Sequence, residues 1–298
     1  MMKPLYYHSL FAIIAIAAAA AYKDNHSIRQ VIAFGDSWTD TGNVYSKLSS
    51  KQWPPSPPYY KGRFSNGPIW VEEMTAKKFV YASLLDYAYG AATTNSADTK
   101  GYSGANSDIP VPSINQQIEE FASTFKNRPT SFPTDTTIYT IWGGGNDYYF
   151  NNSISASIVT GNIVENMQTL VDLFGANRFL ILEQPPLGRL PYFLDKPKER
   201  QLFEQIALWH NGNLSANIHE FESKNCHKAV KVNLHNTYEL VSEIFSKPAK
   251  HGFTEIEKPC LNGTVVCANP DQHLFWDSFH FTSKFSRILA ENVSNHLK

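Results

Sequence analysis

Apolar residues along this chain form two kinds of stretch that alternate with each other. Short, largely apolar runs occupy 30–34, 137–142, 178–183 and 230–234, and a weaker run occupies 83–87. The runs are continuous, which is typical of strands that are covered on both faces in a parallel sheet. The pattern therefore predicts five strands of one mainly parallel sheet.

The longer stretches between these runs have helical spacing. In residues 113–125, for example, Ile114, Ile118, Phe121 and Phe125 fall on one face of a helix. Further helices are predicted at 68–79, 154–174, 198–221 and 283–297. Because strands and helices alternate over most of the chain, we predict an α/β fold with a doubly wound sheet.

One proline-rich segment interrupts this alternation. Residues 53–60 read Trp-Pro-Pro-Ser-Pro-Pro-Tyr-Tyr, and helix and strand patterns resume directly after them. We predict a stiff surface loop here rather than a linker between domains. The 298 residues then divide into an N-terminal segment, 1–21, and a single domain, 22–298.

The N-terminal segment has the pattern of a secretory signal peptide. Lys3 gives a basic start, residues 10–21 form an apolar run, and Ala19 and Ala21 are small residues that suit a cleavage site before Tyr22. The run is short for a bilayer span, and no later segment has about 18 consecutive apolar residues. We expect a secreted, extracellular protein without stable membrane insertion.

Glycosylation sequons agree with export. Five asparagines precede Ser or Thr by two residues with no proline between, which predicts a glycoprotein. They are Asn25, Asn151, Asn213, Asn262 and Asn292.

The three cysteines allow one disulfide and one free thiol in an oxidising compartment. Cys260 and Cys267 enclose a short loop, so they form the expected pair, while pairing of either one with Cys226 stays open. If it is unpaired, Cys226 is expected to be buried. No cysteine or histidine cluster has the spacing of a zinc site.

The net charge of the chain limits the kinds of partner that it is expected to bind. Basic and acidic residues nearly balance, and the formal net charge is −1. Electrostatic binding to nucleic acid or to an anionic membrane is therefore not expected. We expect the protein to act as a monomer.

Candidate chemistry lies where the first strand ends, because doubly wound sheets bind ligands at their carboxyl edge. Gly35, Asp36 and Ser37 follow the run at 30–34. Alone, Ser37 would more simply cap a turn. A serine nucleophile needs a base and a group that orients the base. Asp277 and His280 are three positions apart near the other end of the chain, so one turn can present both.

Two glycine-containing segments can supply the donors that acyl transfer requires. Residues 143–145 are three glycines after the run at 137–142, and they lead to Asn146, whose side-chain amide is a donor. Gly90 follows the weaker run and offers a backbone N–H. Either segment taken alone is an ordinary glycine turn.

Together these segments resemble the SGNH, or GDSL-type, hydrolases. The family's Gly-Asp-Ser, Gly, Gly-x-Asn-Asp and Asp-x-x-His blocks match 35–37, Gly90, 144–147 and 277–280, in the family's order. Trp38 replaces the leucine of the first block. The resemblance implies a three-layer α/β/α sandwich with a mainly parallel five-stranded sheet, flavodoxin-like in topology.

The resemblance also implies a role for each matched residue. Ser37 is the implied nucleophile, His280 its base, and Asp277 the group that orients the histidine. The N–H groups of Ser37 and Gly90 and the side chain of Asn146 form the implied oxyanion hole. The implied reaction is hydrolysis of a carboxylic ester through an acyl-enzyme, with no metal or organic cofactor. The Gly-x-Ser-x-Gly elbow of α/β-hydrolases does not occur.

A narrower resemblance concerns the substrate. Residues 62–70 and 89–94, with the segment from Trp142 to Asn146, look like the fungal acetylesterases of carbohydrate esterase family sixteen. This resemblance implies a small-molecule or oligosaccharide ester as substrate, in particular acetyl esters of plant cell-wall oligosaccharides.

Aromatic side chains in or beside the motif loops suit the apolar face of a sugar. They are Trp38, Trp53, Tyr59, Tyr60, Tyr148, Tyr149 and Trp276. Trp38, Tyr148 and Trp276 are the candidates for contact with substrate. Two alternatives stay open. The chain can be a lipase or phospholipase acting on lipid esters, or an inactive secreted carbohydrate-binding protein on an esterase scaffold.

Four further charged residues lie in the motif loops. Asp36, Asp40 and Asp147 are expected to order these loops as hydrogen-bond acceptors rather than to take part in catalysis. Arg63 is expected to bind either the substrate or a nearby carboxylate.

Overall fold

The five predicted strands form one parallel sheet. The computed structural model describes residues 28–125 and 132–297, so the predicted leader and Asn25 lie outside the described residues. The strands pair in parallel in the order β2-β1-β5-β6-β7. Numbered by their sequence in this sheet, they have the 2-1-3-4-5 order of flavodoxin-like folds. Their bounds are β1 (Gln30–Gly35), β2 (Ser83–Asp86), β5 (Thr137–Trp142), β6 (Arg178–Leu182) and β7 (Lys231–His235).

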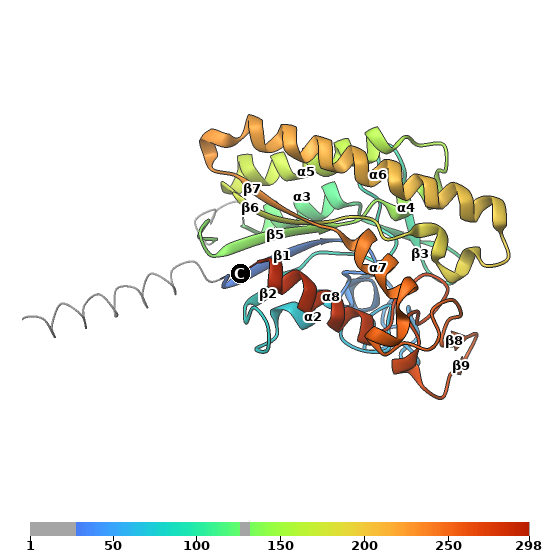
Figure 1. Cartoon of the computed structure of the whole chain (residues 1–298). Helices are drawn as coiled ribbons and strands as arrows, with labels where there is room; N and C mark the ends of the chain where they lie inside the picture. The colour runs from blue at the N-terminus through green and yellow to red at the C-terminus, as the bar shows by residue number, and fades with distance from the viewer. Residues whose placement is uncertain (1–27, 126–131, 298) are drawn as a thin grey trace, which may run out of the picture.

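Helices cover both faces of the sheet, and the alternation of side chains along β1 shows which helices meet which face. The main helices are α2 (Trp70–Thr75), α3 (Ile114–Phe125), α5 (Ala156–Phe174), α6 (Pro197–Lys224), α7 (Thr237–Ser246) and α8 (Ser283–His296). Val31 and Ala33 pack into a core with α2, α7 and α8. Ile32 and Phe34 pack into the opposite core with α3, α5 and α6. Figure 1 shows these layers on either side of the sheet, and the predicted α/β/α sandwich is confirmed.

The structure shortens one predicted helix and adds short elements. The helix predicted over 68–79 is limited to α2, because the backbone becomes extended at Ala76. Most of the added elements are two to six residues long, too short to show a helical period in the sequence. They are α4 (Gly145–Phe150), β3 (Gly101–Ser103), β4 (Ile109–Val111), β8 (Leu261–Asn262), β9 (Val265–Val266), and the turns Val44–Leu48, Leu187–Arg189, Pro191–Phe193, Cys226–Lys228, Pro248–His251 and Pro270–Gln272.

The turns that follow β1 and β5 meet at the carboxyl edge of the sheet. The register of the two strands places Gly35 beside Trp142. A Cβ atom at Gly35 would lie 2.3 Å from the carbonyl oxygen of Trp142, so only glycine permits this approach. Strand order changes direction between β1 and β5, which is where ligands bind in such sheets.

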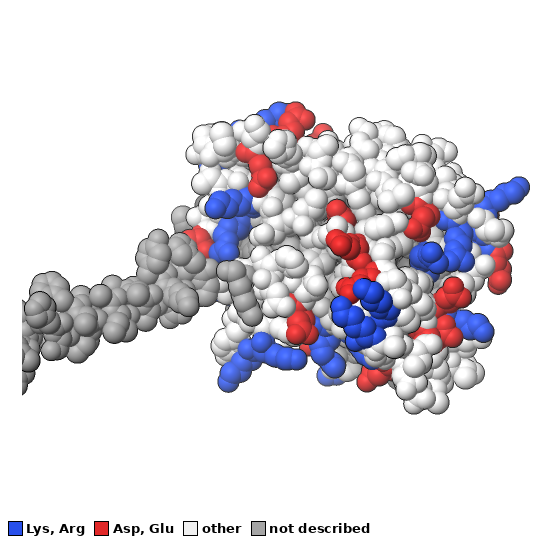
Figure 2. All heavy atoms as spheres, in the orientation of Figure 1, with Lys and Arg blue, Asp and Glu red and all other residues white. Residues whose placement is uncertain are grey.

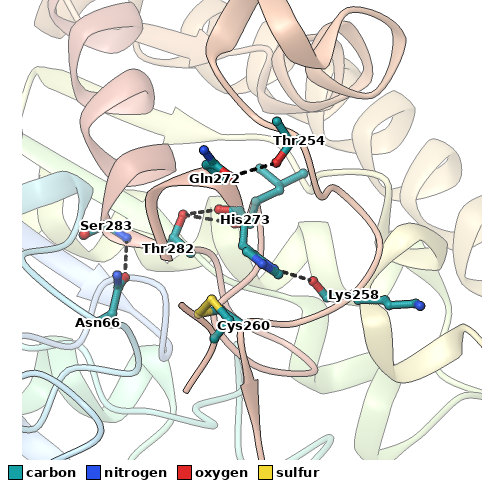
Figure 3. The surroundings of a disulfide bond; sticks show 10 residues. Asn66, Thr254, Lys258, Cys260, Gln272, His273, Thr282 and Ser283 are labelled. Carbon is teal, nitrogen blue, oxygen red and sulfur yellow. Dashed lines mark hydrogen bonds between the residues drawn. A yellow bond between two sulfur atoms is a disulfide. The ribbon is translucent and has the colours of Figure 1, made fainter. Parts of the chain in front are cut away.

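The segment between β7 and α8 contains a hairpin that is closed by a disulfide. Cys260 and Cys267 form a disulfide that joins β8 to β9. Figure 3 shows the surroundings of this bond, where His273 Nδ1 lies 3.3 Å from the carbonyl oxygen of Lys258. Cys226 is free and exposed, so the expectation that it is buried is wrong. It lies in the turn after α6, outside both sheet cores.

The surface agrees with the near-neutral net charge. Acidic and basic side chains are interspersed on the face drawn in Figure 2. Within 28–125 and 132–297, no helix is both long enough and apolar enough to cross a bilayer.

Candidate active site

Ser37 lies in a tight turn directly after β1. Asp36 holds this turn, because its Oδ1 accepts the N–H of Trp38 at 3.0 Å and its carbonyl oxygen accepts the N–H groups of Thr39 and Asp40. Ser37 is half-buried and lines a cavity. In the described part of the chain, its own N–H has no hydrogen-bond partner. Both the hydroxyl and the N–H of Ser37 are therefore free of competing backbone bonds.

The imidazole of His280 connects Ser37 to Asp277. Its Nε2 lies 2.9 Å from Ser37 Oγ, and its Nδ1 lies 2.8 Å from each carboxylate oxygen of Asp277. Asp277 Oδ1 also accepts the N–H groups of Phe279 and His280. Because a carboxylate only accepts, it fixes Nδ1 as the donor and leaves Nε2 to accept from the serine. The structure thus joins residues from the two ends of the chain in the order that the sequence predicts.

The surroundings of Asp277 favour the ionised form of its carboxyl. Burial alone would raise the pKa of its carboxyl, but the charge and hydrogen bond of His280, together with the hydroxyl of Tyr59, lower that pKa below its ordinary value. A negative charge at Asp277 stabilises the imidazolium that forms when His280 accepts a proton.

Gly90 does not present the free N–H that the sequence predicts. Its N–H donates to Asp40 Oδ2 at 2.8 Å, and a Cβ atom there would lie 2.2 Å from the ring of Phe64. Glycine is needed at this position for close packing. The next residue, Ala91, lines the cavity, and its N–H has no partner among the described residues. The prediction for Gly90 is therefore wrong, and the available N–H in this loop belongs to Ala91.

The amide of Asn146 lies at the start of α4 and on the wall of the same cavity. Its Nδ2 donates to the carbonyl oxygen of Ala92 at 3.1 Å and to Asp36 Oδ2 at 3.3 Å. These contacts connect α4 to the loops that follow β1 and β2. They use both hydrogens of the amide, so Asn146 can donate to a substrate oxygen only by exchanging one of them, of which the 3.3 Å contact with Asp36 is the longer. Ser37, Ala91 and Asn146 thus follow three neighbouring strands, β1, β2 and β5, and line one cavity.

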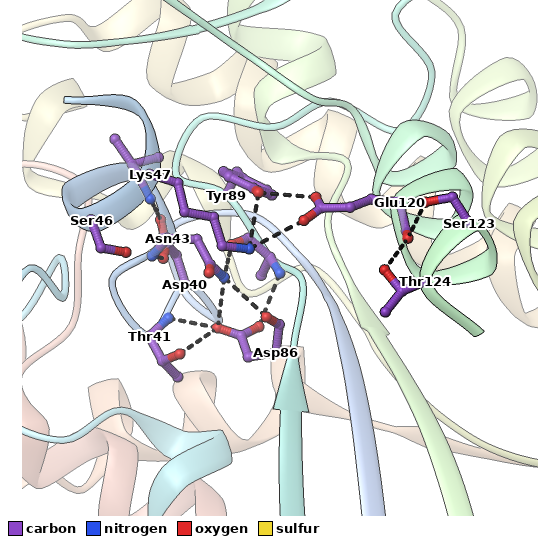
Figure 4. A network of polar contacts seen from close by, with 12 residues as sticks. Asp40, Thr41, Asn43, Ser46, Lys47, Asp86, Tyr89, Glu120, Ser123 and Thr124 are labelled. Atoms are coloured by element: carbon purple, nitrogen blue, oxygen red, sulfur yellow. Dashed lines mark hydrogen bonds and ion pairs between the residues drawn. The ribbon is translucent and has the colours of Figure 1, made fainter. Parts of the chain in front are cut away.

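Buried carboxylates order the loops around these donors. Asp40 accepts four backbone N–H groups, including that of Gly90. Figure 4 shows Asp86 beside it, where Oδ2 accepts both the N–H and the hydroxyl of Thr41 at 2.7 Å. Asp147 accepts the N–H and the hydroxyl of Thr94 in the same way. Asp40 and Asp147 are occupied by these bonds and do not line the cavity.

Arg63 forms an ion pair with a carboxylate and does not line the cavity. Its Nη2 and Nε lie 2.6 Å and 3.1 Å from the two oxygens of Glu72. Glu72 also accepts the N–H of Ile69 at the start of α2. The ion pair therefore fastens the loop that precedes α2.

The cavity beside Ser37 has a volume of about 200 Å³ and is mostly apolar. Its polar wall includes Asp36, Ser37, Asn146 and His280, together with Ser103 and Ser107. Four of its apolar side chains come from the segment between β6 and the middle of α6, which carries no motif in the sequence. They are Leu187, Leu190, Phe193 and Phe203.

Trp38 alone among the three predicted aromatic contacts lines the cavity. Tyr148 is 1% exposed, and its hydroxyl lies 2.8 Å from Nδ1 of the buried His210. Trp276 is 2% exposed and packs against the disulfide hairpin. Tyr149 lines the cavity in place of Tyr148, because consecutive residues of a helix point in different directions. The substrate-contact prediction is therefore wrong for Tyr148 and Trp276.

Known proteins are similar to this chain in sequence and in fold. Residues 31–293 match the family described as GDSL-like Lipase/Acylhydrolase. The chain is 27% identical over 260 residues to a phosphatidylcholine-sterol acyltransferase of Aeromonas hydrophila, an alignment that covers 86% of this chain and 72% of that protein. It is 25% identical over 306 residues to an acetylesterase of Thermothelomyces thermophilus, covering 96% and 95%.

Among solved structures, Est24, a carbohydrate acetylesterase from Sinorhizobium meliloti, superimposes with a TM-score of 0.50 at 14% identity, covering 90% of this chain and 98% of that one. This likeness concerns the fold. The family match extends over most of the chain and includes every segment of the site described above. The chain therefore belongs to the GDSL-like lipase/acylhydrolase family and is a carboxylic ester hydrolase.

Proposed function

We propose that Ser37, His280 and Asp277 hydrolyse carboxylic esters through an acyl-enzyme. The observation that carries this proposal is the 2.9 Å contact between Ser37 Oγ and His280 Nε2, with Asp277 on the other side of the ring. A nucleophile bonded to a base that a third group orients is the arrangement needed to activate a serine hydroxyl.

In the first step, Ser37 Oγ attacks the ester carbonyl carbon while its proton passes to His280 Nε2. The anion on the carbonyl oxygen is held by the N–H groups of Ser37 and Ala91 and by the amide of Asn146. The C–O bond to the alcohol then breaks, and His280 gives its proton to the leaving alcohol. Water attacks the acyl-enzyme by the same route, and the proton that His280 takes from it returns to Ser37 Oγ.

The cavity supports an aliphatic acyl chain longer than acetyl as the preferred substrate group. Apolar surface removed from water stabilises a bound chain by about 0.8 kcal/mol for each buried CH₂ group. An acetyl group would leave most of the wall formed by Leu187, Leu190, Phe193 and Phe203 without contact. This cavity favours the lipase-type alternative over a deacetylase.

A series of nitrophenyl esters from acetate to decanoate tests the chain-length proposal. We expect kcat/KM to rise from acetate to octanoate. Leu190→Trp, which fills the apolar part of the cavity, should lower kcat/KM for octanoate while acetate turnover is kept. An exposed substitution on α6, Lys198→Ala, is the matched control. A preference for acetate in the unsubstituted protein would contradict the proposal.

The second candidate is deacetylation of oligosaccharides, as in carbohydrate esterase family sixteen. The near full-length similarity to an acetylesterase supports it. Trp38, Trp53 and Tyr149 line the cavity and offer flat rings of the kind that bind sugars. Release of acetate from acetylated xylan fragments, faster than hydrolysis of octanoate, would favour this candidate.

We also propose that the protein is exported, with residues 1–21 as a cleaved leader and 22–298 as one catalytic domain. Asn262 is the sequon best suited to carry a glycan, because it is exposed on the β8–β9 hairpin. Asn292 is poorly suited, since its Oδ1 accepts from His235 and Ser294 is buried. Mass spectrometry of the secreted product before and after removal of N-glycans tests both points. An unprocessed N-terminus would contradict the proposed export.

A further inference from the structure

A tyrosine from the proline-rich loop contacts the catalytic carboxylate. Tyr59 lies in the segment 53–60, and its hydroxyl donates to Asp277 Oδ2 at 2.6 Å. Charge-assisted O–H···O⁻ bonds in the range of about 2.5–2.7 Å are strong ones. The two residues are 218 positions apart in the sequence, so the contact is made only in the folded chain.

The ring of Tyr59 is held in place on two sides. It packs nearly perpendicular to Trp276, with centroids 6.2 Å apart, and to Phe64, with centroids 6.5 Å apart. Phe64 in turn packs against the ring of His280 at 5.1 Å. Tyr59 and Cys267 also border the cluster formed by Cys260, Leu261 and Trp276.

The disulfide hairpin supports this arrangement through the backbone. Cys260 N–H donates to the carbonyl oxygen of Phe275, and Leu261 N–H donates to that of Trp276. The hairpin is thus bonded to the two residues that directly precede Asp277. Tyr59 therefore packs against the same disulfide hairpin whose backbone is bonded to the residues before Asp277.

The donors on Asp277 are divided between its two oxygens. His280 Nδ1 lies 2.8 Å from both oxygens, Oδ1 also accepts two backbone N–H groups, and among the described residues the only other donor to Oδ2 is Tyr59. Without the Tyr59 hydroxyl, Oδ2 would retain a single partner. Burial, and then the charge of Asp277, raise the pKa of the Tyr59 phenol, so it stays protonated and remains a donor.

We propose that Tyr59 is a positioning residue for ester hydrolysis, which sets the orientation and effective charge of Asp277 and through it the basicity of His280. The inference rests on the proposed role of the Ser37–His280–Asp277 triad. Tyr59 does not line the cavity, and its hydroxyl bonds to Asp277, so the hydroxyl acts through Asp277.

Tyr59→Phe tests the proposal, because it removes the hydroxyl and keeps the ring contacts. We expect kcat on a nitrophenyl ester to fall about tenfold, the equivalent of 1.4 kcal/mol, with KM unchanged. The acid limb of the pH–rate profile should move to higher pH. The reason is that an Asp277 charge no longer shared with a phenol stabilises protonated His280 more strongly.

Tyr60→Phe is the matched control in the same loop. The Tyr60 hydroxyl has no hydrogen bond within residues 28–125 and 132–297, so this variant should keep the kcat and the acid limb of the unsubstituted protein. Equal losses in both variants, or a loss in Tyr59→Phe without movement of the acid limb, would overturn the proposal in favour of a merely structural loop.

A double-mutant comparison provides a second measurement. In an Asp277→Ala background, Tyr59→Phe should have no further effect on the residual rate, because its acceptor is gone. The same tenfold loss in both backgrounds would show that Tyr59 does not act through Asp277. Failure of the triad itself would look different, since Ser37→Ala would then keep esterase activity.

Discussion

Single side chains at this site are held by partners from distant parts of the sequence. Asp36 contacts Asn146, Asp40 contacts Gly90, and His280 connects Ser37 to Asp277. Each group of the proposed catalytic site is therefore oriented before substrate arrives. Such preorganisation is what makes hydrogen-bond donors effective toward charge that develops in a transition state.

Asn146→Ala tests the contribution of one oxyanion donor. The substitution removes the side-chain amide while the backbone of α4 remains, and loss of one such donor costs about 10²–10³ in kcat. We expect that loss in steady-state assays, with little change in KM. The exposed Asn152→Ala, six residues along the same segment, should behave as the unsubstituted protein. An unchanged kcat in Asn146→Ala would remove this residue from the oxyanion hole.

Ala91→Gly tests the unusual backbone at the second donor. Ala91 has φ 73°, a left-handed conformation that costs an L-residue about 1–2 kcal/mol, whereas glycine adopts it freely. After the entropy cost of glycine in the unfolded chain, about 0.5–1 kcal/mol, we expect unfolding free energy to rise by about 0.5–1 kcal/mol, with activity kept. Urea denaturation measures this. A less stable or inactive variant would mean that the Ala91 methyl group is required.

The residues that matter here were only partly predictable. Ser37, Asp277 and His280 carry motif spacing, so the sequence identifies them. The sequence does not identify Ala91, because an alanine gives no sign of a left-handed φ. The glycine beside it, Gly90, was therefore predicted as the donor instead. Tyr148 and Tyr149 are neighbours on a six-residue helix, and such a short helix shows too little periodicity to tell the buried ring from the exposed one.

At the scale of elements, burial on both faces made the sheet predictable. The three inner strands, β1, β5 and β6, are continuous and buried, whereas the edge strands β2 and β7 are partly exposed. The predicted bounds of all five agree with the structure to within one residue at each end. The sequence did not predict that the segment from η3 (Leu187–Arg189) to the first half of α6 contributes to the cavity, although four of its apolar side chains line the wall. Its irregular turns have no period, and their position over the carboxyl edge depends on the tertiary fold.

The disulfide hairpin is predicted to stabilise the element that carries Asp277 and His280. A disulfide that closes a loop of this length contributes about 2 kcal/mol in the chain-entropy account. Replacement of both Cys260 and Cys267 by Ser should lower the unfolding free energy by about that amount in urea denaturation. Cys226→Ser, at an exposed free thiol, should be neutral. Equal stability of all three proteins would contradict the prediction.

At the scale of the whole molecule, buried carboxyl groups determine how stability depends on pH. Burial raises the pKa of Asp36, Asp86 and Asp147 to about 7 in each case. Each binds its proton more tightly in the folded chain than in the unfolded chain, where the pKa of aspartate is about 3.9. Their stabilisation is complete below that pH and is lost as the pH rises through about 7.

Two other buried groups, His210 and Asp277, titrate below pH 6.5 and so do not affect a measurement made between pH 6.5 and 8. Burial lowers the pKa of His210 to about 3, so its contribution grows as the pH rises and is complete above about 6.5. Asp277, with its lowered pKa, matters only in acid. Between pH 6.5 and 8 we therefore expect the unfolding free energy to fall by about 1–2 kcal/mol. Stability that stays level or rises over this interval in urea denaturation would contradict the expectation.

The central claim is that one serine near the start of the domain is activated by a histidine near its end. Reaction with an organophosphate, followed by peptide mapping in a mass spectrometer, tests this most directly. The account predicts one adduct, on Ser37, which forms slowly in His280→Ala and is absent in Ser37→Ala. A folded protein that stays unlabelled, or that carries the adduct on another residue, would contradict it.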